Sequence, residues 1–281
     1  MIEDQPSRTA QRVAVRRAIH QLCDDPRVFD DPVALRIIGP EEAGELAHKR
    51  PADPASGRHL RAFIAARSRY AEDQLAEAVR RGTRQYVVLG AGLDTFACRN
   101  PFDGLRVFEV DHPATQAWKR SRLESACISV PASMAFVPVD FGRQTLAQGL
   151  KQAGFQEDAP AFFSWLGVTP YLFRETAMAI LQWLISVCSR NGVVFDYIVP
   201  RSSLGPLNRV AFDLLANRVA AAGEPFVGFF DPQELARDLK KMGFEHIEDL
   251  DAEKINGRYF TGRTDGLQVA GAGRLMCARG N

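Results

Sequence analysis

The sequence predicts an α/β fold built around a mostly parallel sheet. From about residue 83 onward, short apolar runs alternate with amphipathic segments, and strands separated by helices pair in parallel. A glycine turn closes the first apolar run, in the stretch "YVVLGAGLDTFA" of residues 86–97. Residues 1–82 are helical in pattern. We therefore expect a helical N-terminal cap over residues 1–82 and an α/β domain over residues 83–281.

Composition and charge exclude several classes of protein. The 281 residues are 46% hydrophobic and 25% charged, and 35 Lys and Arg against 34 Asp and Glu leave a net charge of +1. Nucleic-acid and membrane partners are therefore not expected. The longest apolar stretch, residues 177–188, is shorter than the roughly 20 residues of a membrane-spanning helix. The five cysteines form no C-x-x-C pair, so neither a disulfide framework nor a metal site is expected. Glu3 and Asp4 precede no apolar stretch, which favours a cytoplasmic location over secretion.

The cap is expected to hold two long helices, at residues 7–22 and 59–82, with a loop or linker at residues 49–58. Arg8, Arg12 and Arg16 recur every four residues and therefore share one helix face. That face is either solvated or part of a lid that brings positive charge to an anionic ligand.

The α/β region divides into seven expected strands and the helices between them. An insertion at about residues 200–230 follows the fifth strand. The strands are expected at residues 86–90, 105–110, 134–139, 161–166, 192–199, 245–250 and 273–278, and the helices at 113–126, 143–154, 174–191 and 231–243.

Three features at the ends of successive strands predict a nucleoside site. Gly90, Ala91 and Gly92 form a turn that lets the backbone approach a ligand closely, because the two glycines carry no side chain. The next strand ends with Glu109 and Asp111, and an acid at this place can accept from both hydroxyls of a ribose.

Asp111 follows Gly90 by 21 residues, near the roughly 20 expected for such an acid. Asp140 and Phe141 end the third strand and suit an adenine, with the acid taking the amine and the ring packing on the base. Asp111 and Asp140 could instead cap the helices that follow them.

The turn lacks the third glycine of a dinucleotide-binding fingerprint. Thr95 stands at that position, and Asp94 precedes it. A carboxylate here would repel a pyrophosphate, whereas S-adenosylmethionine has no phosphate and carries two positive groups. The pattern favours S-adenosylmethionine, and an NAD(P)-dependent oxidoreductase is the alternative.

The stretches "ARSRYAEDQLAEAVRRGTRQYVVLGAGLDTFACRNP", "VFEVDHPATQAWKR" and "VPVDF" resemble the leucine carboxyl methyltransferase family, and most closely its bacterial and mycobacterial branch. The resemblance implies a class I S-adenosylmethionine-dependent methyltransferase fold, a Rossmann-like seven-stranded sheet with helices on both faces. Its last strand would be antiparallel.

The resemblance also implies roles for individual residues. Arg67 would pair with the methionine carboxylate of the cofactor, although with Arg61 and Arg69 it could instead belong to a solvated helix face. The backbone of residues 90–92 would lie against the cofactor, Asp111 would bind the ribose, and Asp140 with Phe141 would bind the adenine.

The chain departs from the family at one position near the cofactor. Leu166 stands where many members have a glutamate, which puts in doubt how the cofactor's amino group is bound at that strand. Tyr171, a little further on, is equally suited to the core and to the site.

We expect an S-adenosylmethionine-dependent O-methyltransferase that acts on a carboxyl or hydroxyl group of a small molecule. Phe226, in the aromatic end of the insertion, would line the acceptor pocket. No catalytic residue is assigned, because a carboxylate acceptor needs no base, and for His112 a structural role is favoured over that of a base. A non-catalytic S-adenosylmethionine-binding protein is a further alternative. The sequence predicts no oligomeric state.

Overall fold

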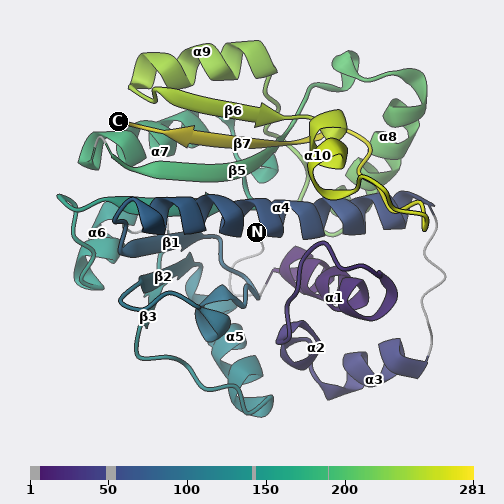
Figure 1. The fold of residues 1–281 in the computed structure, drawn as a ribbon, viewed down its shortest axis with the longest axis horizontal. Helices are drawn as coiled ribbons and strands as arrows, with labels where there is room; N and C mark the ends of the chain where they lie inside the picture. Colours follow the sequence, from purple (N-terminus) through teal and green to yellow (C-terminus); the bar gives the residue numbers. More distant parts are fainter. Residues whose placement is uncertain (1–6, 49–54, 141–143, 189) are drawn as a thin grey trace.

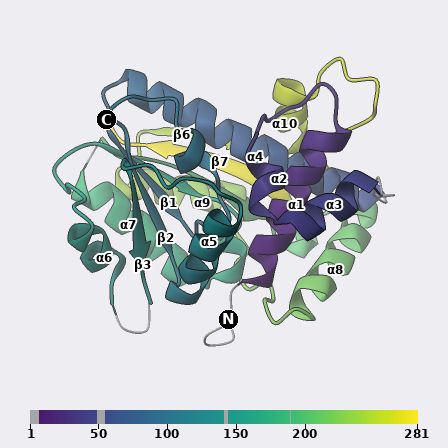
Figure 2. The ribbon, with the colours of Figure 1, turned by 90° about the horizontal axis from the view of Figure 1, so that it is seen from below.

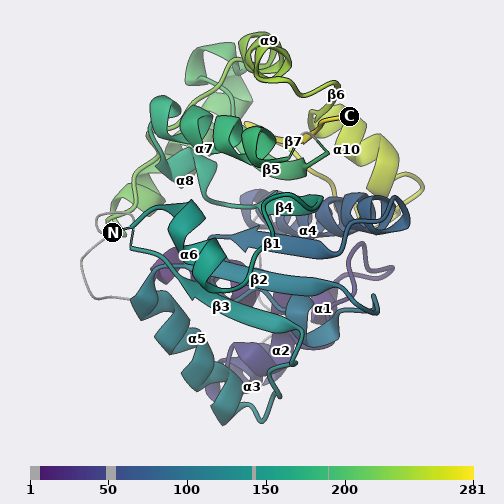
Figure 3. The ribbon, with the colours of Figure 1, turned by 90° about the vertical axis from the view of Figure 1, so that its left-hand side faces the viewer.

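The structure, a computed structural model, describes residues 7–48, 55–140, 144–188 and 190–281. Seven strands form one twisted sheet in the order β3-β2-β1-β4-β5-β7-β6 (Figure 1). Figure 3 shows them following one another from β6 at the top to β3 at the bottom. The strands are β1 (Gln85–Leu89), β2 (Arg106–Asp111), β3 (Met134–Pro138), β4 (Ala161–Trp165), β5 (Gly192–Ile198), β6 (His246–Leu250) and β7 (Gly273–Arg279).

The strand pairing confirms the class I methyltransferase fold. Strands β1 to β5 pair in parallel, and β7 runs antiparallel to both β5 and β6. The order of the strands reverses between β1 and β4. From β1 the chain adds β2 and β3 on one side of the sheet, and it then returns to place β4 and β5 on the other side. Ligands of open α/β sheets bind at the carboxyl ends of the strands at such a reversal.

Helices cover both faces of the sheet, and α4 runs across it (Figure 1). The helices are α1 (Arg8–Cys23), α2 (Ala34–Ile37), α3 (Pro40–His48), α4 (Ala55–Arg80), α5 (Pro113–Ser125), α6 (Leu146–Gln152), α7 (Arg174–Val187), α8 (Pro206–Ala220), α9 (Pro232–Met242) and α10 (Ala252–Tyr259). Short 3-10 helices lie at Phe96–Arg99, Thr169–Tyr171 and Arg201–Ser203.

Strand β1 shows why the sheet needs both layers of helices. All five of its residues are buried, as expected for a parallel strand covered on both faces. Val87 and Leu89 join the core cluster under α6, α7 and α9, while Tyr86 and Val88 join the cluster under α4. This alternation follows from the two-residue period of a strand.

Some predicted boundaries were wrong. Helix α4 begins at Ala55, so residues 55–58 of the predicted loop are helical, and residues 49–54 lie outside the described residues. Helix α7 ends at Val187 rather than at residue 191. Helices α2, α3, α8 and α10 were not predicted.

Helices α1–α3 and α8 gather at one end of the molecule (Figure 2). The turn after β1 contacts α1 there, since a Cβ atom on Gly92 would lie 3.0 Å from the Ala10 Cβ. This end therefore holds the carboxyl ends of the parallel strands. Among the described helices, none has the length and apolar character needed to cross a lipid bilayer.

Candidate functional site

The glycine turn after β1 is held between two neighbouring strands. Gly90 and Gly92 have φ angles of +67° and +48°, which side chains other than glycine rarely adopt. The N–H groups of Gly90 and Ala91 both donate to the Val110 carbonyl, at 2.9 and 3.0 Å. On the other side, a Cβ atom on Gly90 would lie 2.4 Å from the Val168 side chain. The turn is therefore fixed against the ends of both β2 and β4.

The predicted ribose acid lies at this turn. The Asp111 carboxylate accepts hydrogen bonds from the N–H of Gly92 at 2.6 Å and of His112 at 2.7 Å. Burial raises the pKa of this carboxyl, and the two backbone N–H groups oppose the rise. The structure thus brings Asp111 and the glycine turn together.

The helix-cap alternatives fail for both acids. The N-cap of α5 is His112, whose Nδ1 accepts from the Ala114 N–H, so Asp111 does not fill that role. The N-cap of α6 is Thr145, in a capping box with Gln148, so Asp140 does not cap that helix. His112 has a structural role here, in agreement with the expectation.

Asp140 lies near Asp111, because the Val139 N–H donates to the Asp111 carbonyl at 2.9 Å. Phe141 lies outside the described residues. The adenine role of these two residues therefore stays a prediction.

Glu109, the other acid of β2, is taken up by the core. It is 1% exposed and forms a salt bridge with Lys119 of α5, which is also 1% exposed. Burial raises the pKa of Glu109 to about 7. This pair holds α5 against β2 and leaves Asp111 as the acid at the turn.

Arg67 of α4 reaches the end of β4. Its Nη1 donates to the Asp196 Oδ2 of β5 at 2.7 Å, and both side chains are buried. The Asp196 Oδ1 accepts the Gly167 N–H at 2.5 Å. Arg61 is buried as well, whereas Arg69 is exposed, so the solvated-face alternative for Arg67 is wrong.

Leu166 precedes this glycine and is only partly buried, packing against the core cluster under α4. It offers no polar group at the place where many family members have a carboxylate. The carboxylate next to this turn is that of Asp196 in the neighbouring strand β5, which accepts the Gly167 N–H. Asp196 was not predicted as a site residue, although a single acid inside the apolar run "GVVFDYIV" is an unusual signal.

Helix α1 closes over the glycine turn from the other side. Arg17 is buried, donates from Nη2 to the Leu93 carbonyl at 2.5 Å, and lies 3.7 Å from the Asp94 carboxylate. Of the predicted arginine face, Arg12 is exposed and Arg16 donates to the Gly57 carbonyl at 3.1 Å. The arginine of α1 that contacts the turn is thus Arg17, outside the predicted face; the Arg8 side chain is not described.

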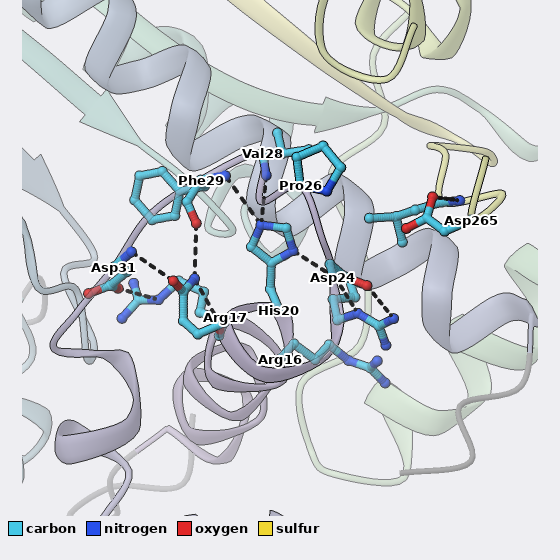
Figure 4. A network of polar contacts seen from close by, with 12 residues as sticks. Arg16, Arg17, His20, Asp24, Pro26, Val28, Phe29, Asp31 and Asp265 are labelled. Atoms are coloured by element: carbon cyan, nitrogen blue, oxygen red, sulfur yellow. Dashed lines mark hydrogen bonds and ion pairs between the residues drawn. The ribbon is translucent and has the colours of Figure 1, made fainter. Parts of the chain in front are cut away.

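A polar network anchors α1 (Figure 4). His20 Nδ1 lies 2.7 Å from an Asp24 oxygen, and His20 Nε2 accepts from the N–H groups of Val28 and Phe29, both at 3.2 Å. Both ring nitrogens are therefore occupied, and Nδ1 carries the proton donated to Asp24. Arg61 of α4 binds the same carboxylate at 2.8 and 3.0 Å, which ties α1 to α4. The His20–Asp24 pair is structural.

Polar and aromatic groups gather where α1 begins. The hydroxyls of Ser7 and Thr9 both donate to the Glu224 carboxylate, and Thr9 also contacts the Tyr171 hydroxyl. The rings of Tyr171 and Phe226 lie 5.4 Å apart. Segment 224–228 thus lies beside the end of β4, and the N–H groups of Val227 and Gly228 donate to the Pro170 carbonyl.

The donor set fits S-adenosylmethionine better than a dinucleotide. A long helix does not follow β1; the next element is the 3-10 helix Phe96–Arg99. The Phe96 N–H at its start donates to the Asp94 carboxylate at 2.8 Å, so an acid already occupies the place of a pyrophosphate. The roles of Asp111 in ribose binding and of Arg67 in binding the methionine carboxylate stay predictions.

The cavity found in the structure lies away from this site, and no candidate metal site was found among the described residues. A cavity of about 170 Å³, lined by Phe162 and Gly192 among others, lies at the opposite, amino-terminal ends of β4 and β5. Within the described part of the chain, no group of three or more His, Cys, Asp or Glu side chains could hold a metal ion.

Known proteins show the same fold and a related sequence. A Bacillus subtilis protein named "Putative S-adenosyl-L-methionine-dependent methyltransferase YktD" is 34% identical over 96% of this chain and 96% of its own length. A "Putative S-adenosyl-L-methionine-dependent methyltransferase" of Mycobacterium marinum is 29% identical over 96% of this chain and 85% of its own length.

Among solved structures, a protein of the duf574 family from Streptomyces avermitilis is similar with a TM-score of 0.56 and 16% identity, each chain being covered completely. A Thermobifida fusca structure titled "putative methyltransferase" has a TM-score of 0.56 and 15% identity, over 100% of this chain and 97% of its own. The family profile described as leucine carboxyl methyltransferase matches residues 10–185. The chain therefore belongs to the leucine carboxyl methyltransferase family of S-adenosylmethionine-dependent enzymes.

Proposed function

We propose that this S-adenosylmethionine-dependent methyltransferase transfers a methyl group to an oxygen atom of a small molecule, in a carboxyl or a hydroxyl group. When bound, S-adenosylmethionine supplies an electrophilic methyl group. The protein must then bind the cofactor, align the acceptor oxygen with the methyl group, and exclude water. The observation that carries this proposal is the convergence of Asp111, the glycine turn and Arg67 at the carboxyl ends of β1, β2 and β4.

Each of these groups has a task in cofactor binding. Asp111 would accept from the two ribose hydroxyls, since a carboxylate oxygen has lone pairs left after accepting one backbone N–H. Arg67 would donate to the carboxylate of the cofactor. Asp140 and Phe141 would hold the adenine.

The acceptor would lie on the side of Tyr171 and Phe226. The rings of Tyr171 and Phe226 are partly exposed and, with the buried Phe212 at 6.2 Å from Phe226, would give the acceptor an apolar surface. Burial raises the pKa of Tyr171 to about 12, so its hydroxyl keeps its proton at neutral pH.

The two acceptor classes differ in their need for a base. A carboxylate is already ionised at neutral pH and needs none, whereas a hydroxyl must lose its proton. Glu224 is the carboxylate beside Tyr171, because Thr9 contacts both side chains. A hydroxyl acceptor would transfer its proton to Glu224.

The experiment is to incubate the protein with S-adenosylmethionine and a panel of small carboxylic acids, phenols and alcohols, and to detect methylated products by mass spectrometry. Methyl esters are cleaved by mild alkali and methyl ethers are not, so the product identifies the acceptor class. Glu224→Gln should abolish methylation of a hydroxyl and leave that of a carboxylate unchanged. Phe226→Asp should reduce activity on the true acceptor while S-adenosylhomocysteine still binds.

Two outcomes would contradict the proposal. Binding of S-adenosylhomocysteine without any methylated product would favour a non-catalytic binding protein. Full activity of Phe226→Asp on the true acceptor would exclude the apolar acceptor surface.

A further inference from the structure

We propose that Asp196 binds the ammonium group of the cofactor's methionine end, in place of the glutamate that Leu166 replaces. This inference rests on the proposed function and deepens it. The buried pair of Arg67 and Asp196 would then form one receptor for a zwitterion, with Arg67 taking the carboxylate and Asp196 the ammonium.

The pair is buried and held from both sides. The Arg67 Nη1 lies 2.7 Å from the Asp196 Oδ2, and the two side chains are 9% and 5% exposed. The Gly167 N–H donates to the other Asp196 oxygen at 2.5 Å, and the Thr169 hydroxyl donates to the Asp196 carbonyl. Asp196 is therefore fixed within the carboxyl-terminal half of β5, with its carboxylate directed to the turn after β4.

Both side chains keep hydrogen-bonding capacity. Within the described residues, Arg67 donates from Nη1 alone, although a guanidinium has five N–H groups. Each Asp196 carboxylate oxygen accepts one hydrogen bond there, although each has two lone pairs. An ammonium and a carboxylate held next to each other on one carbon atom match these remaining groups in charge and in type.

Glycine residues bring this pair to the cofactor turn. A Cβ atom on Gly167 would lie 2.9 Å from the Arg67 Nη2, so the guanidinium lies directly on this backbone. The next residue, Val168, contacts Gly90 of the turn after β1. The Arg67–Asp196 pair is thus connected through residues 167 and 168 to the turn that carries Asp111 on its other side.

The charges of the pair are opposite to those of an amino acid's two ends. Removing two charges from water costs free energy that their mutual attraction often fails to recover. A zwitterion bound beside the pair would add a carboxylate next to Arg67 and an ammonium next to Asp196, while the contact between the two side chains stays in place. The carboxylate missing at position 166 would be supplied by the neighbouring strand, at a site that β4 and β5 share.

The test compares ligands with and without the amino-acid end. We would titrate S-adenosylhomocysteine and 5′-methylthioadenosine, which lacks the amino acid, into the wild type and Asp196→Asn by calorimetry. Asp196→Asn should weaken the binding of S-adenosylhomocysteine about tenfold or more, because a charged hydrogen bond to this ligand is lost. The affinity for 5′-methylthioadenosine should stay within about twofold of the wild-type value, because this ligand has no ammonium group. Leu166→Glu in the Asp196→Asn background should restore part of the lost affinity. Asp213→Asn, an exposed acid of α8 that pairs with Arg201, is the matched control and should change neither affinity.

Equal weakening of both ligands would assign Asp196 a purely structural role and overturn the inference, and so would unchanged binding of both. If Asp196→Asn does not fold, the wild type decides the question with the deaminated analogue of S-adenosylhomocysteine, which keeps the carboxylate and lacks the ammonium. That analogue should bind about tenfold more weakly than S-adenosylhomocysteine, and equal affinity would overturn the inference. Failure of S-adenosylhomocysteine to bind the wild type at all would instead contradict the proposed function.

Discussion

Glu109–Lys119 and Arg67–Asp196 are both buried ion pairs near the carboxyl ends of the parallel strands, and they differ in their surroundings. Lys119 and Glu109 are each 1% exposed and join a helix to the strand before it. Arg67 and Asp196 lie against the backbone of Gly167, whose φ angle is +74°. The second pair therefore lies where backbone can approach a ligand, and the first lies between α5 and the sheet.

The comparison shows that burial and charge alone do not identify a site. Glu109 has the raised pKa that is often taken as a sign of function, yet it contacts Lys119 beneath α5. Asp111, two residues further along the same strand, reaches the glycine turn. The position relative to the strand end distinguishes the structural acid from the candidate binding acid.

The largest effect is expected for Lys119→Met. This substitution leaves Glu109 buried without its cation and should destabilise the protein by about 3–5 kcal/mol in urea unfolding. The double variant Glu109→Gln/Lys119→Met removes both charges and should recover most of the loss. An unfolding free energy of Lys119→Met equal to that of the wild type would show that the pair does not stabilise α5 on β2.

A smaller effect is expected for Asp111→Ala, and on binding instead of stability. The substitution should weaken the binding free energy of S-adenosylhomocysteine by about 1–3 kcal/mol, because charged hydrogen bonds to the ribose are lost. Calorimetry measures this directly, with Asp213→Asn as the control. Unchanged affinity would mean that Asp111 does not bind the ribose.

Gly167→Ala separates backbone strain from the displacement of Arg67. The left-handed conformation should cost any alanine about 1–2 kcal/mol of stability. Gly262 has a φ angle of +77° with open space around it, so Gly262→Ala is the matched control that carries strain alone. Only Gly167→Ala should also weaken S-adenosylhomocysteine, because its Cβ would displace the Arg67 guanidinium. Equal affinities of the two variants would contradict the contact between Arg67 and the cofactor.

A further effect is a pH dependence from Glu109. Its pKa of about 7 in the folded protein exceeds the ordinary value of 4.5, so between these values the folded state binds more protons than the unfolded state. The contribution of Glu109 to stability should therefore fall as pH rises through this window. The unfolding free energy of the wild type minus that of Glu109→Gln should decrease from about pH 5 to about pH 7. A constant difference would show that Glu109 does not titrate there.

The sequence predicts what local patterns determine. The seven strands follow from apolar runs, and Gly90, Gly92 and Asp111 follow from turn chemistry and spacing along the chain. Helix α8 was missed, although Gly205 followed by Pro206 is a recognisable start signal for a helix.

The contacts that complete the candidate site depend on tertiary packing. Asp196 meets Arg67 across 129 positions of the sequence, and Glu224 meets Thr9 across 215. Contacts between residues so far apart in the sequence leave no short-range pattern from which they could be predicted. Arg17 lies next to the predicted arginine face and turns inward because Ala14 and Ala18 place its side of α1 in the core.

The most direct test of cofactor binding at the strand ends is a calorimetric titration of the wild-type protein with S-adenosylhomocysteine and, separately, with NAD⁺. Saturable binding of S-adenosylhomocysteine and no heat of binding with NAD⁺ are expected, because Asp94 occupies the place of a pyrophosphate and Asp111 and Arg67 match a nucleoside with an amino-acid end. Binding of NAD⁺ without binding of S-adenosylhomocysteine would contradict the assignment.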